Sequence, residues 1–140
     1  MHIGRQARFR AHPAGRVLAL AGVLLALATV CGAFGAHALK AQLAPERLQV
    51  WDTAVRYQFF HALGLIGVGL TLRTLDAGAL RAAAALIVAG IALFSGSLYA
   101  LALGAPHALG VLAPLGGLAW IAGWLLFAWG AWQDVRPDDL

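Results

Sequence analysis

The longest stretch without an acidic or basic side chain constrains this chain more than any other feature. From Ala82 to Gln133 the sequence has 52 consecutive residues without Asp, Glu, Lys or Arg, and a second such stretch, from Val17 to Leu39, has 23. A water-exposed surface needs charges at regular intervals, whereas each crossing of the hydrocarbon core needs about 20 mostly apolar residues. Charged residues make up only 11% of the chain, against roughly 25% in soluble domains. An integral membrane protein is therefore predicted.

Four segments of the chain are long and apolar enough to be considered as crossings. They should be helices, because every backbone polar group must be paired within the segment when the surroundings are hydrocarbon. The second segment is the least uniform, since several polar residues lie in its first half. Pro114 predicts either a kink or a helix that starts there. The predicted fold is all-α, a polytopic four-transmembrane-helix bundle in one membrane domain over residues 1–140, with helices at about 17–37, 51–72, 82–103 and 111–132.

A basic extension, residues 1–16, precedes the first apolar segment and resembles the start of a signal peptide. The apolar run that follows reaches about 20 residues, which is longer than the roughly 7 to 15 of a signal sequence. Val30 stands immediately before Cys31, where a lipoprotein signal would favour a small residue. We therefore expect this segment to remain as an uncleaved first transmembrane helix.

The basic residues predict how the chain is oriented in the membrane. Four crossings place both termini on one side, and cytoplasmic segments carry the excess of Lys and Arg. The terminal side would hold seven basic residues and the opposite side three, which predicts a bacterial inner-membrane protein with both termini in the cytoplasm. Trp51 is expected at the outer interface, and Trp129 and Trp132 at the inner one. The seven are Arg5, Arg8, Arg10, Arg16, Arg73, Arg81 and Arg136, and the three are Lys40, Arg47 and Arg56.

Polar residues inside the second segment are the first candidates for function, because ionisable groups are costly in lipid. Tyr57 and His61 are four residues apart and so share one helical face, which we expect to point into the bundle and to contact the third segment near Ser95 to Tyr99. His61 is interpreted either as a neutral imidazole bonded to a neighbouring helix or as a proton- or ligand-binding group. Asp52 and Arg56 are also four apart, which favours an interfacial ion pair with Arg56 reaching outward.

The third and fourth segments carry small residues that are typical of helix packing. Ser95, Gly96 and Ser97 predict close helix approach and an interhelical hydrogen bond. Glycines at intervals of seven in the fourth segment predict a packing seam on one face; they are Gly116, Gly123 and Gly130.

Metal and cofactor chemistry have no support in the sequence. No cofactor is predicted, and the histidines at 37, 61 and 107 lack metal-ligand spacing. The lone Cys31 is interpreted as a packing residue.

Several short motifs together resemble a known family. They are Gly32-Ala33-Phe34-Gly35-Ala36-His37, Tyr57-Gln58 followed by His61, Phe94-Ser95-Gly96-Ser97-Leu98-Tyr99, Pro114-Leu115-Gly116-Gly117 and Gly123-Trp124. In this order they resemble the YgdD/YwdK-like family of small inner-membrane proteins, which includes a human transmembrane relative. The resemblance implies a four-helix multi-pass protein with an uncleaved first helix, and it implies no activity. A threonine is expected before the proline of the fourth motif, where this chain has Ala113.

The expected function is that of a non-enzymatic membrane protein whose polar intramembrane cluster binds lipid, a small ligand or a partner subunit. The alternative is an oligomeric transporter or proton-coupled channel. Expected partners are the lipid bilayer and a second copy or another membrane protein, but not nucleic acid, because the basic residues flank apolar spans. The candidate binding residues are His37, Tyr57, Gln58, His61, Ser95, Ser97 and Tyr99.

Overall fold

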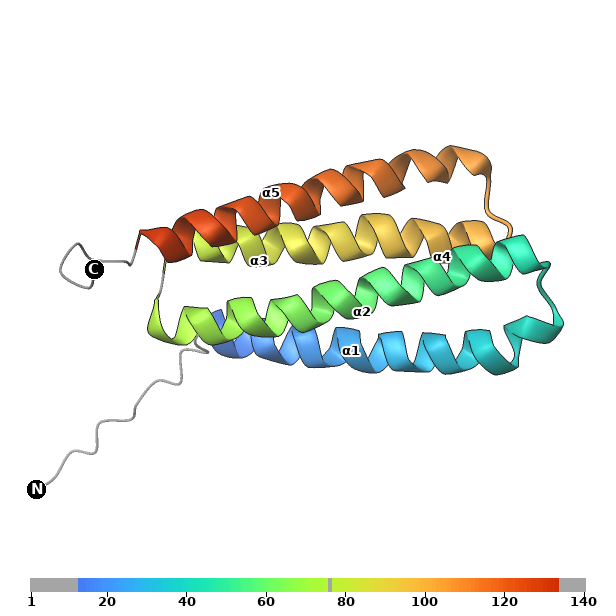
Figure 1. Cartoon of the computed structure of the whole chain (residues 1–140), viewed down its shortest axis with the longest axis horizontal. Coiled ribbons are helices and arrows are strands. Elements are labelled where there is room, and N and C mark those ends of the chain that lie inside the picture. Colours follow the sequence, from blue (N-terminus) through green and yellow to red (C-terminus); the bar gives the residue numbers. More distant parts are fainter. Residues whose placement is uncertain (1–12, 76, 134–140) are drawn as a thin grey trace, which may run out of the picture.

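Four long helices lie side by side along the molecule (Figure 1). The computed structural model describes residues 13–75 and 77–133, and within these ranges it contains helices, short connections and no strand. The elements are α1 (Pro13–His37), η1 (Leu39–Ala41), α2 (Pro45–Thr74), α3 (Gly78–Gly90), η2 (Ile91–Ser95), α4 (Gly96–Ala102), η3 (His107–Val111) and α5 (Leu112–Trp132). The prediction of an all-α fold is confirmed.

The four rods run alternately up and down. α3, η2 and α4 follow one another without a break and form the third rod, Gly78–Ala102. α2 and this third rod are the central pair, while α1 packs mainly on α2 and α5 packs mainly on α3. α1 begins and α5 ends at the same end of the bundle, which we call the terminal end; η1 and η3 lie at the opposite, loop end (Figure 1).

Three helical stretches are long and apolar enough to cross a membrane, namely Pro13–Ala41, Gly78–Ala102 and His107–Trp132. α2 does not meet the same criterion, although at 30 residues it is the longest α-helix in the described chain. The reason is the charged and polar side chains in its first half, which lower its mean hydropathy. The structure and the composition therefore agree on a multi-pass membrane protein with three clear spans.

Several helix boundaries differ from the predicted ones. α1 begins at Pro13, so residues 13–16 are helical, while the rest of the predicted extension, residues 1–12, lies outside the described residues. α2 begins at Pro45, six residues early, because proline suits the first position of a helix and Glu46 complements the helix dipole there. α5 begins at Leu112, so Pro114 lies within its first turn, where a proline costs little.

The glycine seam predicted for the last segment is confirmed. A side-chain carbon added at Gly116 would lie 2.6 Å from the backbone nitrogen of Phe94, and one at Gly123 would lie 3.2 Å from the Ile87 side chain. At Gly130 the nearest atom would be a Leu80 methyl, at 3.1 Å. Helices in lipid associate through close packing rather than through the hydrophobic effect, so the three glycines allow α5 to lie directly against the third rod.

The third rod has an irregular turn that the sequence did not predict. Ile91–Ser95 form a π-helical segment, in which one extra residue is accommodated in the turn. Ile91 and Ser95 are buried there. Gly116 faces this segment, and the missing side chain lets the α5 backbone approach the widened turn.

Candidate functional site

Gln58 is the centre of a hydrogen-bonded connection between three helices. The Gln58 side chain is 5% exposed, and its amide nitrogen donates to the carbonyl oxygen of Leu24 in α1 at 2.9 Å. The Tyr99 hydroxyl in α4 donates to the Gln58 amide oxygen, also at 2.9 Å. One side chain therefore links α1, α2 and α4 through polar contacts that lipid could not supply.

The two serines of the third rod behave differently from each other. Ser95 is buried and its hydroxyl donates to the carbonyl oxygen of Ala54 in α2 at 2.9 Å, which confirms the predicted interhelical hydrogen bond. Ser97 donates to Phe94 within its own rod. Gly96, between them, is exposed and has no atom of another element near it, so the prediction that it permits close helix approach is wrong.

Tyr57 and His61 lie on the neighbouring side of α2. His61 Nδ1 is 2.9 Å from the carbonyl oxygen of Tyr57, so its hydrogen bond stays within α2. The imidazole stacks on the indole of Trp120 in α5, with ring centroids 3.6 Å apart. The Tyr57 ring lies 5.0 Å from that of Phe94 and remains 41% exposed. Trp120, not the Ser95–Tyr99 segment, is therefore the main neighbour of this face.

The predicted contact of Tyr57 and His61 with Ser95 to Tyr99 is thus wrong. Tyr57 meets the third rod at Phe94, and the adjacent residue Gln58 is the one that contacts Tyr99. Adjacent helix residues point about 100° apart, so the face of Gln58 is distinct from that of Tyr57. The buried face of α2 is the one that contains Gln58, and its members are Trp51, Ala54, Gln58, Ala62, Leu65, Val68, Gly69 and Leu72.

Trp120 is the principal residue that sequence reasoning missed. It is 4% exposed, and its indole nitrogen donates to the carbonyl oxygen of Ile87 at 3.1 Å. Gly90 makes this position possible, because a side chain there would collide with the indole. A signal was present, since Trp120 lies four residues after Gly116 and three before Gly123, on the face of the glycine seam.

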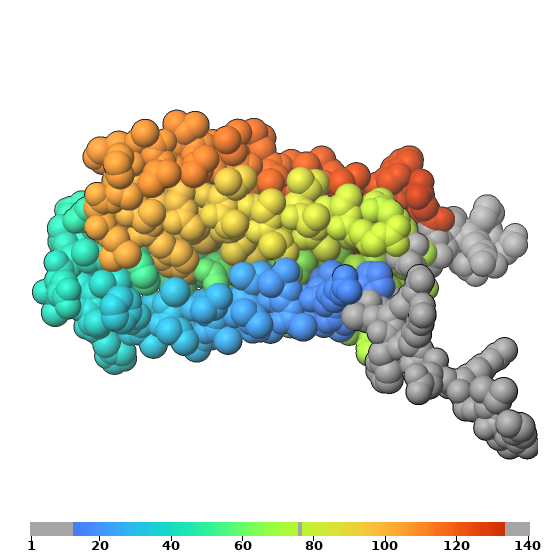
Figure 2. Space-filling model, turned by 180° about the vertical axis from the view of Figure 1, so that it is seen from behind, coloured from blue at the N-terminus to red at the C-terminus, as the bar shows by residue number. Residues whose placement is uncertain are grey.

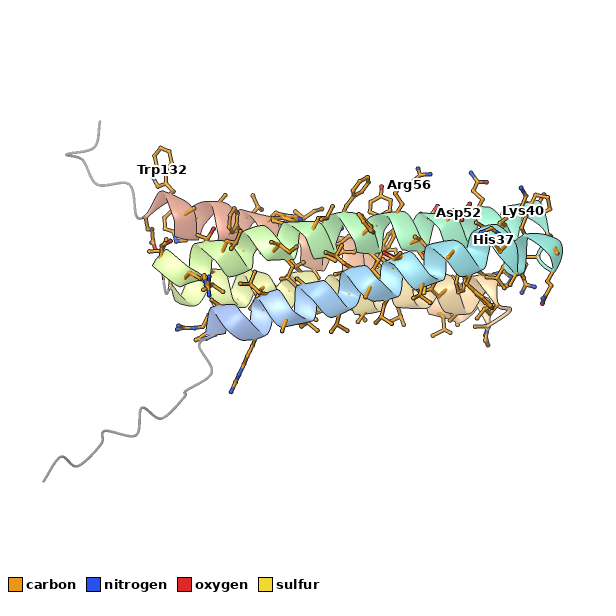
Figure 3. The ribbon with its side chains drawn as sticks, turned by 90° about the horizontal axis from the view of Figure 1, so that it is seen from below. His37, Lys40, Asp52, Arg56 and Trp132 are labelled. Atoms are coloured by element: carbon orange, nitrogen blue, oxygen red, sulfur yellow. The ribbon has the colours of Figure 1, made fainter. Side chains whose placement is uncertain are left out.

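The remaining predicted residues do not join the cluster. His37 is exposed in the last turn of α1, and in the described part of the chain it makes no hydrogen bond or ring contact. Asp52 and Arg56 are exposed in the half of α2 nearer the loop end, and the ion pair predicted between them is not formed (Figure 3). Among residues 13–75 and 77–133, no three His, Cys, Asp or Glu side chains come together as metal ligands would.

Trp51, predicted at the outer interface, packs inside the bundle. It is 5% exposed, and its indole nitrogen donates to the carbonyl oxygen of Cys31 at 2.9 Å. Gly35 leaves the space for this contact, because a side-chain carbon there would lie 2.7 Å from the indole. Cys31 packs in the same cluster, as predicted. Trp132, in contrast, is exposed at the terminal end (Figure 3).

The polar groups thus divide into two sets. Gln58, Ser95, Ser97 and Tyr99 are hydrogen-bonded within the bundle, and no buried side-chain nitrogen or oxygen of the described residues lacks a partner. The Tyr57 hydroxyl and the second ring nitrogen of His61 have no hydrogen-bond partner in the described chain.

Apolar rods joined by buried polar contacts and glycine seams define the class of this molecule, which is a multi-pass α-helical membrane protein. The chain belongs to the family described as "Protein of unknown function (DUF423)", whose model matches residues 31–117. Curated relatives of the chain include UPF0382 membrane proteins, among them YwdK and YgdD, which confirms the resemblance drawn from the motifs.

Three of these relatives span most of the chain. YwdK of Bacillus subtilis is 43% identical over 79% of this chain and 92% of its own length. The protein SH2409 of Staphylococcus haemolyticus is 42% identical over 79% of this chain and 91% of its own length. The inner membrane protein YgdD of Escherichia coli is 34% identical over 71% of this chain and 76% of its own length. No solved structure matches.

Proposed function

We propose that this protein is a four-pass, non-enzymatic inner-membrane protein with both termini in the cytoplasm, and that it associates with a partner subunit through the face of α2 that carries Tyr57 and His61. The observation that carries the proposal is the division of the polar cluster. Gln58, Ser95 and Tyr99 hold the helices together through interhelical hydrogen bonds. Tyr57 and His61, in contrast, retain polar atoms without a partner in the described chain.

The path of the chain supports a fourth crossing by α2. α1 and the third rod are both clear spans, and α2 runs from the loop end, where α1 finishes, to the terminal end, where α3 starts (Figure 1). A helix in this position crosses the bilayer together with its neighbours. Counting about 20 residues back from Arg73 reaches Ala54, which places Tyr57 and His61 inside the hydrocarbon core.

The energetics of lipid favour a partner at this face. A polar group without a hydrogen bond in hydrocarbon costs several kcal/mol, and lipid tails offer none. The Tyr57 ring is 41% exposed and the imidazole of His61 is covered on one side by Trp120. A polar side chain or backbone carbonyl of a partner helix would satisfy both groups, and a second copy of the chain is the simplest source.

The test is native mass spectrometry of the protein extracted from its membrane in mild detergent. We expect the wild type to carry a second subunit, and His61→Leu and Tyr57→Phe to lose it progressively. Phe59→Leu is the control, because Phe59 is exposed elsewhere on α2 and offers no polar atom. A wild type that is extracted as a bare monomer, or a His61→Leu variant with unchanged association, would contradict the proposal.

A further inference from the structure

The two flanks of the central helix pair are filled differently. Between α2 and α5, large rings occupy the space: His61 lies against Trp120, and Trp124 lies over Gly64. Between α1 and α3, on the other flank, the helices make little direct contact, and three alanines of α3, at positions 84, 85 and 89, face the space between them. The second flank therefore remains open.

The open flank is a groove of about 770 Å³. Leu65 of α2 forms its floor and is fully buried, while Leu20 on the α1 wall is 40% exposed toward the surroundings. Figure 2 shows atoms of α2, in green, between the blue α1 and the yellow α3. The groove has the volume of a typical ligand pocket, roughly 300–1,000 Å³. Its lining includes Arg16, Leu20, Leu65, Arg81, Ala85 and Ala89.

The charges of the groove are restricted to one end. Arg16 is in the first turn of α1 and Arg81 is in the first turn of α3, so both lie toward the terminal end of the bundle. From Arg81 to Ala89 the α3 wall is otherwise apolar and extends about 12 Å, at 1.5 Å per residue. One leaflet of the hydrocarbon core is about 15 Å thick. The groove therefore extends from the membrane interface through most of one leaflet.

We propose that this groove is a binding site for an anionic phospholipid, with one acyl chain lying along the alanine-rich wall of α3 and the headgroup phosphate between Arg16 and Arg81. A phosphate complements both guanidinium groups and accepts hydrogen bonds from them. Basic positions between transmembrane helices at the cytoplasmic surface are typical of anionic-lipid sites. With both termini in the cytoplasm, as proposed above, the groove lies in the cytoplasmic leaflet.

An acyl chain fits this groove better than a partner helix does. A helix with its side chains is about 10 Å across, and seating one here would place apolar side chains against two arginines. In a phospholipid, the apolar acyl chain matches the apolar wall of the groove, and the anionic headgroup at its end matches the charged end of the groove.

The first experiment tests the charged end. The purified full-length protein is titrated with dioleoylphosphatidylglycerol or dioleoylphosphatidylcholine in mild detergent, and bound lipid is counted by native mass spectrometry. We expect the wild type to prefer phosphatidylglycerol, and Arg16→Gln with Arg81→Gln to lose about fivefold in phosphatidylglycerol affinity per arginine, with phosphatidylcholine binding unchanged. Arg73→Gln is the matched control, because Arg73 is exposed at the terminal end of α2 but does not line the groove.

The second experiment tests the apolar wall. Ala85→Phe should fill the groove without disturbing buried contacts, because Ala85 is exposed, and it should abolish the binding of both lipids. Ala82→Phe, exposed on α3 outside the groove, is its control. Soluble glycerol phosphate should not displace the lipid, because it lacks the acyl chain that the wall binds.

Several results would overturn the proposal. Equal affinity of the wild type for the two lipids would show that the charged end does not bind the headgroup. Unchanged lipid binding in Ala85→Phe would show that the apolar wall does not bind an acyl chain. A dimer that Ala85→Phe converts to a monomer assigns the groove to a second copy of the chain. Lipid binding that occurs only after removal of residues 2–12 assigns it to the N-terminal segment of the chain itself. Because Tyr57 and His61 lie on the other flank, their variants leave this measurement unaffected.

Discussion

At the scale of single residues, the two tyrosines show how position around a helix determines the role of a side chain. Tyr99 donates its hydroxyl to Gln58 in the interior, and through Gln58 it is connected to the backbone of α1. Tyr57 has the same hydroxyl at a comparable depth but lies 41% exposed on a face without a partner for it. The chemical group is identical, so the difference in energy arises only from what surrounds it.

Removing each hydroxyl should therefore have unequal effects. Tyr99→Phe deletes one interhelical hydrogen bond and leaves the Gln58 oxygen unpaired. The free energy of unfolding should therefore fall by about 0.6 kcal/mol, the average for such bonds in a membrane protein, and by no more than about 1.7 kcal/mol, their maximum. Tyr57→Phe should leave the stability of the monomer unchanged. Unfolding in mixed micelles measures both.

A double variant extends this comparison. Gln58→Met combined with Tyr99→Phe should cost less than the sum of the single changes, because the two side chains share one hydrogen bond. Equal losses in Tyr57→Phe and Tyr99→Phe, or strict additivity in the double variant, would contradict the assigned contacts.

At the scale of elements, the contact between α5 and the third rod depends on glycines, which have no side chain, alternating with the large ring of a tryptophan. The glycines at 116, 123 and 130 leave spaces, and the ring of Trp120 stands between the first two. Trp120 in turn occupies the space left by Gly90 on the other helix. The π-helical turn Ile91–Ser95 lies against Gly116, which makes this the closest part of the seam.

Gly116 and Gly117 form a matched pair for testing this seam. Gly116→Ala would bring a carbon to 2.6 Å from the Phe94 backbone nitrogen, and because backbone cannot move aside as a side chain can, the helices must separate. We expect a loss of about 1–3 kcal/mol in the free energy of unfolding, as for an overpacked core. At Gly117 an added carbon meets nothing within 4 Å, so Gly117→Ala should be neutral. Thermal unfolding in detergent measures the stability of both variants. Equal losses of stability in Gly116→Ala and Gly117→Ala would contradict the assigned packing.

At the scale of the whole molecule, the bundle is polarised along its length. Among the described residues, the terminal end carries Arg16, Arg73 and Arg81, and the loop half carries Lys40, Arg47 and Arg56. Four further arginines, at positions 5, 8, 10 and 136, precede the first helix or follow the last one in the sequence, which makes seven basic residues against three. α1 begins and α5 ends at the same end of the bundle, as the proposed four crossings require (Figure 1). The excess of positive charge predicts that the terminal end faces the cytoplasm.

Reporter fusions test this orientation. Alkaline phosphatase fused after Leu140 should be inactive, because the enzyme requires the periplasm, and the same reporter inserted near Pro45 should be active. Green fluorescent protein fused after Leu140 should be fluorescent and serves as the expression control. An active phosphatase after Leu140 would contradict both the even number of crossings and the orientation.

The sequence by itself determined that this chain belongs in a membrane, the approximate extent of its helices and the glycine seam of α5. These follow from the length of apolar runs and from the spacing of residues along one helix, which are local properties. The early starts of α1 and α2 are small departures, since helices extend beyond the hydrocarbon core.

Only the tertiary structure decided which side of each helix is interior. In a soluble protein, hydrophobicity separates the buried face from the exposed one, but in lipid both faces are apolar and that signal is lost. Tyr57 and Gln58 are adjacent polar residues in α2, and only the positions of α1 and α4 select Gln58 for the core. The same limit hid the buried Trp120 and the open groove between α1 and α3, because both depend on which helices become neighbours and how closely they approach.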